Sequence, residues 1–291
     1  MISRPLGAGA PHVSAVGYGG MHLSIDGRPP EAQALQVLGA VLDAGVTLID
    51  TADAYCLDDR DVGHNERLIA RALAARRGNR SGVVVATKGG VVRTGGRWDT
   101  DGSPAHLRTA CDRSLEALGA ERIDLYQLHA PDPKVPFEES VGALAGLRQE
   151  GKVRWVGLSN VSVEQIRIAR AMVPITTVQN RLNPFFKESL SGGVVPYCTE
   201  NGIGFLAYSP TGGGRLNRKL PSHPVVAGIA SRLGVSAHAV VLAWVLAQSP
   251  IVIPIPSARR VEHALDSVSA DRITLSPGDL ATIDEAEFSR A

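Results

Sequence analysis

The sequence contains few features that would place it in a special class of protein. Its 291 residues include three cysteines, which form no CxxC pair and leave one residue over from any disulfide. This pattern favours a reducing compartment. Aromatic residues make up 4% of the chain and the formal net charge is +1. We therefore expect no general attraction to nucleic acid or to an anionic membrane.

Long hydrophobic segments are missing as well. Residues 1–6 lack the apolar core of a signal peptide. The longest apolar run, 239–247, is too short to span a bilayer. The basic runs, such as Arg76-Arg77 with Arg80, are short and typical of solvated helix ends. The sequence therefore predicts a cytoplasmic protein with no membrane or nucleic-acid partner.

Short apolar strands alternate with helical segments along the whole chain. This alternation predicts an α/β protein, a single (β/α)8 TIM-barrel domain over residues 1–291 with a short N-terminal β-hairpin and extra C-terminal helices. An open doubly wound sheet would need a phosphate-binding glycine turn after the first strand, which the sequence lacks. The expected strands lie at 13–20, 46–49, 83–87, 125–128, 153–158, 175–178, 203–207 and 251–253. The expected helices lie at 30–44, 65–76, from 104, 138–149, from 161, 225–233, 237–248, 261–268 and 277–287, and 89–102 is expected to be a glycine-rich loop.

Three of these strands end on an ionisable side chain. Asp50 follows the second strand, Lys88 the third and His129 the fourth, and Tyr55 lies in the loop just beyond Asp50. In a parallel barrel the carboxyl ends of the strands share one face, where the chemistry of that fold takes place. We therefore expect these four side chains to meet.

These four side chains suit the reduction of a carbonyl group. A hydride that reaches a carbonyl carbon leaves an alkoxide, which needs a proton. A tyrosine has a pKa of about 10, and a neighbouring lysine would lower it. Asp50 would keep Lys88 charged, and His129 would orient the carbonyl oxygen. Taken singly, each residue also has a purely structural interpretation, such as a solvated loop cation for Lys88 or a turn cap for Asp50.

The same segments resemble the catalytic signatures of the aldo-keto reductase family. The resemblance implies that Asp50, Tyr55, Lys88 and His129 form a tetrad with Tyr55 as the general acid, in an NADPH-dependent reductase of a small aldehyde or ketone. Many members have Gly after the tyrosine, whereas Cys56 stands here and the following loop is longer. The segments that carry the resemblance are Ile49-Asp50-Thr51-Ala52 with Tyr55, Gly63-His64-Asn65-Glu66, Ala86-Thr87-Lys88 and Asp124-Leu125-Tyr126-Gln127-Leu128-His129.

Polar groups at the ends of strands five to seven are expected to bind the NADP(H) cofactor. The hydroxyl and amide groups of Ser159, Asn160 and Gln179 match the donors and acceptors of a carboxamide, and the resemblance implies that they hold the nicotinamide. Tyr208 would stack on its ring. Further cofactor contacts are expected from Gly20, Met21, Asp50, Ser209, Pro210, Thr211, Gly212 and Gly213.

The adenine end of the cofactor is expected after strand eight. Arginine suits a phosphate because its guanidinium stays charged and donates parallel hydrogen bonds. The resemblance places the 2′-phosphate near Arg259 and Arg260, and we expect Arg259 to matter more. Ser257, His263 and Asp266 complete this end, although several positions depart from the family pattern. The substrate pocket is expected to be lined by Met21, His22, Trp98 and Asp132.

Two other functions remain open from the sequence. A regulatory subunit of the same fold would bind the nucleotide without physiological turnover, and the lack of an extra N-terminal segment argues against it. An isomerase or aldolase would use Lys88 as a Schiff-base nucleophile, which borohydride trapping would reveal. Cys56 is either a reactive thiol that Lys88 activates or a buried, unreactive one.

Overall fold

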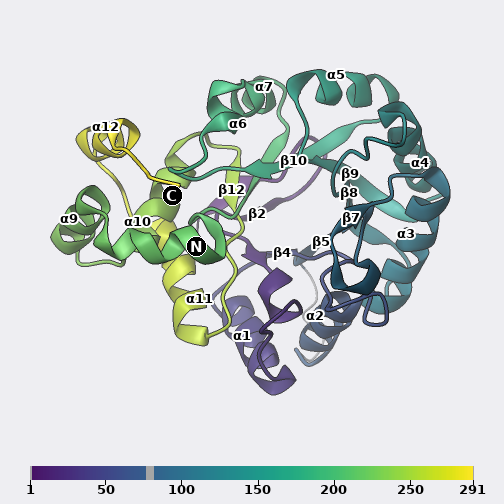
Figure 1. The fold of residues 1–291 in the computed structure, drawn as a ribbon, viewed down its shortest axis with the longest axis horizontal. Coiled ribbons are helices and arrows are strands. Elements are labelled where there is room, and N and C mark those ends of the chain that lie inside the picture. Colours follow the sequence, from purple (N-terminus) through teal and green to yellow (C-terminus); the bar gives the residue numbers. More distant parts are fainter. Residues whose placement is uncertain (1, 77–81, 291) are drawn as a thin grey trace.

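Eight parallel strands form the centre of the molecule (Figure 1). The computed structural model describes residues 2–76 and 82–290, so Arg77 and Arg80 lie outside the described residues. Two backbone hydrogen bonds close the ring, from Gly17 N–H to the Pro254 carbonyl and from Gly19 N–H to the Pro256 carbonyl, both 2.9 Å. The predicted (β/α)8 barrel is therefore confirmed. Its strands are β3 (Tyr18–Gly19), β4 (Leu48–Asp50), β5 (Val84–Gly89), β8 (Ile123–Leu128), β9 (Val153–Ser159), β10 (Ile175–Arg181), β11 (Gly204–Tyr208) and β12 (Val252–Pro254).

Helices surround the strands, and α9 and α12 lie further out on one side (Figure 1). Serines start several helices as the sequence suggests: the Ser103 hydroxyl accepts the His106 N–H, and Ser162 forms a capping box with Gln165. The helices between and beyond the strands are α1 (Glu31–Asp43), α2 (His64–Ala74), α3 (Pro104–Leu118), α4 (Phe137–Gln149), α5 (Val163–Met172), α9 (Pro224–Leu233), α10 (Ala237–Ala247), α11 (Val261–Val268) and α12 (Pro277–Glu285). Three short helices were not expected from the sequence: α6 (Glu188–Ser191), α7 (Val194–Glu200) and α8 (Gly213–Leu216).

The N-terminal hairpin covers one end of the barrel. It consists of β1 (Ser3–Pro5) and β2 (His12–Ser14), so Val13 and Ser14 belong to the hairpin and not, as the sequence suggested, to the first barrel strand. Leu6 in its turn is fully buried and packs with side chains that fill the barrel interior. These side chains are Leu48, Val84, Ala86, Leu125, Trp155, Leu206 and Ile253. The hairpin thus completes the interior core.

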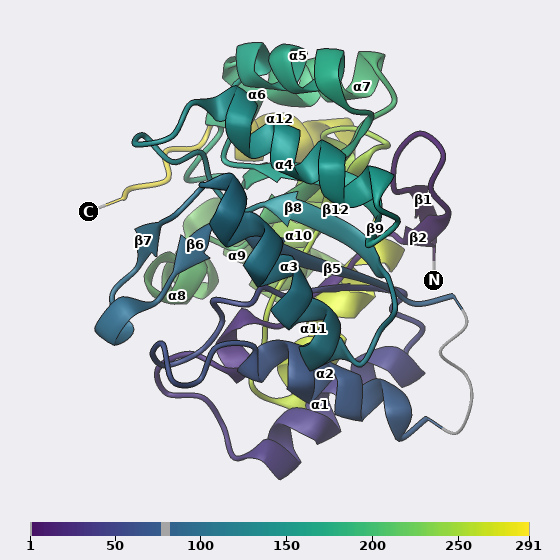
Figure 2. The same cartoon turned by 90° about the vertical axis from the view of Figure 1, so that its right-hand side faces the viewer.

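A second hairpin lies at the opposite end of the barrel (Figure 2). It consists of β6 (Val91–Val92) and β7 (Asp99–Thr100), joined through a turn in which Gly95 and Gly96 have positive φ angles of 56° and 80°. The segment 89–102 is therefore not only a loop, because the two glycines allow its ends to pair. This hairpin stands at the carboxyl ends of the barrel strands.

Helix α10 is apolar on nearly every side, and all of its residues except His238 and Ala247 are buried. Among the described residues, no single helix has both the length and the hydropathy of a membrane span. Helices α9 and α10 pass that test only as a pair, with a 97° bend between them.

Close approach of the N-terminal hairpin to β11 predicts that Gly204 tolerates no side chain. A Cβ atom at Gly204 would lie 1.9 Å from the Leu6 carbonyl oxygen, whereas one at Gly228 in α9 would meet nothing within 4 Å. We expect Gly204→Ala to destabilise the protein by about 1–3 kcal/mol through overpacking. We expect Gly228→Ala to stabilise it by up to about 1 kcal/mol through helix propensity. Thermal unfolding of both variants tests this pair of predictions, and an equal melting midpoint in the two would contradict them.

Candidate active site

Lys88 lies at the centre of a buried polar cluster. Its side chain is 0% exposed, and its Nζ donates three hydrogen bonds: 2.7 Å to Asp50 Oδ2, 2.8 Å to the Thr51 carbonyl and 3.0 Å to the Tyr55 hydroxyl oxygen. An ammonium group has three protons, so all of them are used. Because Lys88 donates to the Tyr55 oxygen, the Tyr55 proton must point elsewhere.

The protonation states of this cluster follow from burial and from these contacts. Burial alone would lower the pKa of Lys88, but Asp50 and Tyr55 outweigh it, and the net pKa is raised. For Tyr55, burial raises the pKa more than Lys88 lowers it. The expectation of a lowered Tyr55 pKa is therefore wrong in its net sign, because desolvation of the phenolate exceeds the attraction of the ammonium. In this structure Tyr55 is held as a protonated phenol.

Asp50 is fixed through both carboxylate oxygens. Oδ2 accepts from Lys88, and Oδ1 accepts from the Gln179 side chain at 2.7 Å and from Gln127 at 3.5 Å. The carboxylate is thus held by residues from three other strands, β5, β10 and β8. A buried ion pair of this kind is stable only when its remaining lone pairs are satisfied, and here they are.

His129 lies beside Tyr55, with its ring edge-on and the ring centroids 5.7 Å apart. Burial lowers the pKa of His129 well below its usual range, and the positive charge of Lys88 adds to the effect. The ring is therefore neutral at pH 7. Its Nδ1 is buried and has no hydrogen-bond partner among the described residues.

A second group of side chains fixes the strands that carry the cluster. The Thr51 hydroxyl donates to Asn65 Oδ1 at 2.7 Å, and the Thr87 hydroxyl donates to Glu66 Oε1 at 2.6 Å. Asn65 Nδ2 also donates to the Gly20 carbonyl at 2.8 Å. The first turn of α2 thus holds the ends of β3, β4 and β5 together. These contacts of Asn65 and Glu66 were not expected from the sequence, where the two residues were noted only as part of the signature.

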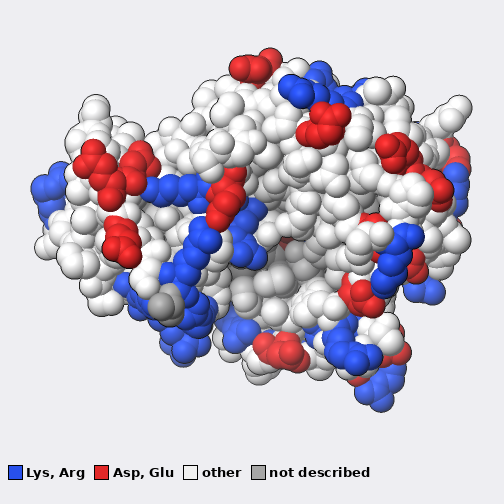
Figure 3. All heavy atoms as spheres, turned by 45° about the horizontal axis from the view of Figure 1, so that its top comes forward, with Lys and Arg blue, Asp and Glu red and all other residues white. Residues whose placement is uncertain are grey.

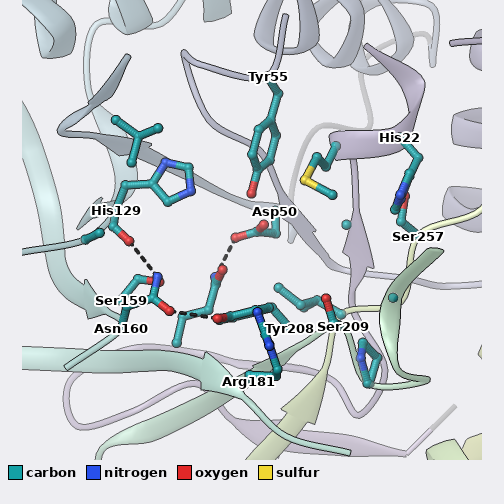
Figure 4. Close-up of a pocket in the computed structure, with 18 of the residues that line it drawn as sticks. His22, Asp50, Tyr55, His129, Ser159, Asn160, Arg181, Tyr208, Ser209 and Ser257 are labelled. Atoms are coloured by element: carbon teal, nitrogen blue, oxygen red, sulfur yellow. Dashed lines mark hydrogen bonds between the residues drawn. The ribbon is translucent and has the colours of Figure 1, made fainter. Parts of the chain in front are cut away.

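A cavity of about 570 Å³ opens over this cluster, and Figure 4 shows the side chains that line it. Two non-glycine residues at its wall have positive φ angles, Asn160 at 60° and Ser209 at 47°. Such backbone strain is common where a chain is shaped around a ligand. The residues predicted for the site that do line the cavity are Met21, His22, Asp50, Tyr55, Trp98, His129, Ser159, Asn160, Gln179, Tyr208, Ser209, Pro210, Thr211, Gly213 and Ser257.

Comparison with known proteins agrees with this geometry. The model of the Aldo/keto reductase family matches residues 15–287. The chain belongs to the aldo/keto reductase family.

Relatives of this aldo/keto reductase cover nearly its whole length. An uncharacterized oxidoreductase of Schizosaccharomyces pombe is 34% identical over 278 residues, which is 94% of this chain and 86% of that protein. A Glycine max protein named Probable aldo-keto reductase 1 is 34% identical over 310 residues, 97% of this chain and 87% of that protein. The crystal structure of an aldo/keto reductase from Klebsiella pneumoniae in complex with NADP and acetate has a TM-score of 0.81 at 27% identity, covering 98% of this chain and 95% of that one. These similarities support a general oxidoreductase role.

Some residues predicted for the site lie away from the cavity of this aldo/keto reductase. Asp132 does not line it, because its carboxylate accepts the backbone N–H groups of Gly102 and Lys134, both at 2.9 Å. Both carboxylate oxygens of Asp132 thus hold the local backbone, and its contact with a substrate stays a prediction. Other predicted cofactor contacts outside the cavity lining stay predictions: Gly20, Gly212, Arg259, Arg260, His263 and Asp266.

Of the two alternatives for Cys56, the structure favours the buried thiol. It is 0% exposed, and burial raises its pKa to about 12. Its Sγ lies 3.4 Å from the Ala54 carbonyl oxygen. Among the charges that shift the pKa of this thiol, Arg93 lowers it, but the effect of burial is larger. Lys88 is not one of the charges that shift this pKa, so activation by Lys88 has no support here.

Arg181 at the cavity wall was not expected from the sequence. Arg181 lines the cavity, because β10 extends to Arg181 and does not end at 178 as predicted. The apolar pattern ends three residues earlier, so sequence periodicity could not show that the strand continues. The position of Arg181 two residues after Gln179, on the same strand face, was the available signal.

Burial of His129 predicts an effect of pH on stability. A histidine whose folded-state pKa is lowered loses stabilisation as the pH falls below the unfolded value of about 6.5, because the unfolded chain then binds a proton that the folded chain does not. Between pH 6.5 and 5 we expect the stability of the native protein to fall more steeply than that of His129→Gln, by at most about 1.4 kcal/mol per pH unit. Urea unfolding at several pH values measures both slopes. Identical slopes would mean that His129 titrates alike in the folded and unfolded chains.

Proposed function

We propose that the protein reduces an aldehyde or a ketone to an alcohol, with NADPH as the hydride source and Tyr55 as the general acid. The observation that carries this proposal is the Lys88 ammonium, which is hydrogen-bonded to both Asp50 and Tyr55 beneath an open cavity. The arrangement combines a proton donor, a group that fixes it and room for a small substrate.

The donors and acceptors at the cavity wall fit a nicotinamide. Gln179 gives its side-chain N–H to Asp50, which leaves its Oε1 facing a ligand's amide N–H. The Ser159 hydroxyl accepts from Asn160 at 3.1 Å and keeps its own proton to donate. The Tyr208 ring is held by a 2.7 Å hydrogen bond from its hydroxyl to Asn160 Oδ1, so it presents a fixed face for stacking. A related structure from Klebsiella pneumoniae contains NADP.

The residues of this chain supply orientation and a proton. When bound, the cofactor supplies the hydride. Neutral His129 donates one ring N–H to the carbonyl oxygen and so places it next to the Tyr55 hydroxyl. Tyr55 then gives its proton to the developing alkoxide. Lys88 stabilises the tyrosinate that remains, because its ammonium already donates to that oxygen.

The site argues against the Schiff-base isomerase or aldolase but is compatible with the regulatory subunit. A Schiff-base mechanism needs an accessible, unprotonated amine, whereas Lys88 is fully buried, uses all three protons in hydrogen bonds and has a raised pKa. A regulatory subunit remains compatible with the site. Turnover of NADPH with a panel of aldehydes and ketones distinguishes it from a reductase.

Removal of the Tyr55 hydroxyl tests the acid directly. We expect Tyr55→Phe to lower the rate of carbonyl reduction by about 10²–10⁴-fold, since the ring is kept and only the proton donor is lost. The dissociation constant for NADPH should change little. Tyr197→Phe is the matched control, because Tyr197 lies on α7 and its hydroxyl contacts Arg170. A Tyr55→Phe enzyme with native turnover, when hydride transfer limits the rate, would disprove the assignment.

The contacts of the two arginines after β12 suggest different roles. Arg259 donates to the His22 carbonyl at 3.2 Å and to the Asp26 carbonyl at 3.0 Å, so it ties the loop after β3 to the end of β12. Arg260 is the N-cap residue directly before α11, and its side chain is 66% exposed. One of its guanidinium nitrogens lies 4.0 Å from a carboxylate oxygen of Glu262. We therefore assign the 2′-phosphate to Arg260 and the helix N-terminus, and a positioning role to Arg259. This reverses the order of importance expected from the sequence.

This division predicts two different patterns of cofactor affinity. Arg260→Ala should weaken NADPH by about tenfold and leave NADH unchanged, because only the phosphate contact is lost. Arg259→Ala should weaken both cofactors alike, because the loop that carries His22 is released. Fluorescence titration of each variant with NADPH and NADH gives the four constants. Selective loss of NADPH binding in Arg259→Ala, with native binding in Arg260→Ala, would contradict the assignment.

A further inference from the structure

Arg181 is the one lysine or arginine among the described residues that line the cavity. It ends β10 and pairs in register with Tyr208 of β11. Figure 4 shows Arg181 beside Tyr208, across the cavity from Tyr55. Neither the carbonyl chemistry nor the nicotinamide contacts described above use this cation.

The rest of the cavity does not neutralise Arg181. Asp50 is paired with Lys88, and Asp99 lies 3.4 Å from the Lys134 ammonium. His22 and His129 are neutral at pH 7, because burial lowers the pKa of each ring. The charges that line the cavity are therefore balanced except for the one positive charge of Arg181.

Aromatic contacts fix the guanidinium and leave its donors available. The guanidinium carbon lies 4.5 Å from the Phe186 ring centroid and 5.6 Å from that of Tyr208. The Ser189 hydroxyl donates to the Arg181 backbone carbonyl, but the guanidinium itself has no hydrogen bond or ion pair with any of the residues that the structure describes. Arg181 contributes to lowering the pKa of Glu188, but that carboxylate is bound by Arg290 at 2.5 Å. Stacking orients a guanidinium without using its N–H groups.

Basic side chains also extend beyond Arg181 on this face. The guanidinium carbon of Arg290 lies 4.1 Å from the centroid of the Phe186 ring, the same ring that Arg181 contacts. Arg215 donates a hydrogen bond to the Arg290 backbone carbonyl. Figure 3 shows lysine and arginine side chains gathered on one side of the hollow at the centre of this face. Of the two arginines that contact the Phe186 ring, Arg290 is paired with Glu188, so Arg181 is the one whose charge is left for a ligand.

We propose that Arg181 binds an oxyanion, a carboxylate or a phosphate, of a molecule held in the cavity. Two parallel N–H groups of a guanidinium match the two oxygens of such a group. The oxyanion belongs either to a carbonyl substrate or to the diphosphate of the cofactor. Both of these ligands are inferred from the proposed function, so this part of the proposal rests on it. With a substrate, the anion would lie across the cavity from the carbonyl group at Tyr55, so the chain would prefer acidic aldehydes or ketones.

Two arms of one experiment distinguish the sources. The first measures by calorimetry the binding of 4-formylbenzoate and of its neutral analogue 4-formylbenzamide. The second measures the binding of NADPH and NADH, which share the diphosphate. Both use the native protein, Arg181→Met, Arg181→Lys and Arg154→Met. Arg154 is the matched control, because it stacks on Trp155 at 4.3 Å near the start of β9, at the other end of that strand from the cavity.

If the substrate supplies the oxyanion, the native protein binds the benzoate about tenfold more tightly than the benzamide, and Arg181→Met loses this preference. Arg181→Lys keeps part of it, and added salt reduces it. If the cofactor supplies the oxyanion, Arg181→Met weakens NADPH and NADH by the same factor, unlike Arg260→Ala. Either pattern supports an oxyanion contact at Arg181.

The proposal is overturned if Arg181→Met changes neither the benzoate preference nor the affinity for the two cofactors. It is also overturned if Arg154→Met gives the same changes, since they would then reflect overall charge. Turnover of both aldehydes is measured alongside. If the native protein binds 4-formylbenzoate through Arg181 but turns over neither that aldehyde nor the benzamide with NADPH, the proposed reductase function is contradicted and the oxyanion contact stands.

Discussion

The Lys88 ammonium and its hydrogen bond to Asp50 impose the main constraint on this structure. Both side chains are almost completely buried, at 0% and 3% exposure. Removing one partner of such a pair leaves an uncompensated buried charge, which costs about 3–5 kcal/mol. The surrounding groups must therefore satisfy every remaining donor and acceptor. Thr51, Tyr55, Gln127 and Gln179 do so, and they come from different parts of the barrel wall.

This constraint connects the fold to the proposed chemistry. A parallel barrel brings the ends of β4, β5, β8 and β10 to one rim, and only there can these side chains surround one ammonium. The first turn of α2 holds the same strand ends through Asn65 and Glu66. The other end of the barrel is filled by Leu6 and the N-terminal hairpin. The apolar interior is thus closed at one end of the barrel, and the buried polar cluster lies at the other.

The sequence was sufficient for the barrel and for the cluster around Lys88, because both leave strong local patterns. Apolar strands alternate with helices, and Asp50, Lys88 and His129 stand at or next to the end of a strand, with Tyr55 in the loop beyond Asp50. The sequence could not show that β10 extends to Arg181, because the added residues are polar and project from a strand end. It also could not show the pairing of β6 with β7, which depends on the positive φ angles of two glycines.

The sequence also could not show how deeply each side chain is buried or which groups it contacts. The net shift of the Tyr55 pKa depends on how completely the ring is desolvated, and the sequence specifies only that a lysine is near. The same holds for Cys56, whose neighbour in sequence is the proposed acid but whose thiol points into the core. Asp132 was expected in the substrate pocket, yet its carboxylate satisfies two backbone N–H groups. In each case burial and local hydrogen bonds decide the role.

The central claim is that Lys88 acts on the reaction through Tyr55 and not independently of it. A double-mutant cycle on the rate of carbonyl reduction, with Lys88→Met and the Phe variant of Tyr55, tests it most directly. Residues that act as one unit are strongly non-additive. If Lys88 acts through Tyr55, the double variant should be about as slow as the slower single variant. Rate losses that multiply, as for two independent groups, would contradict it.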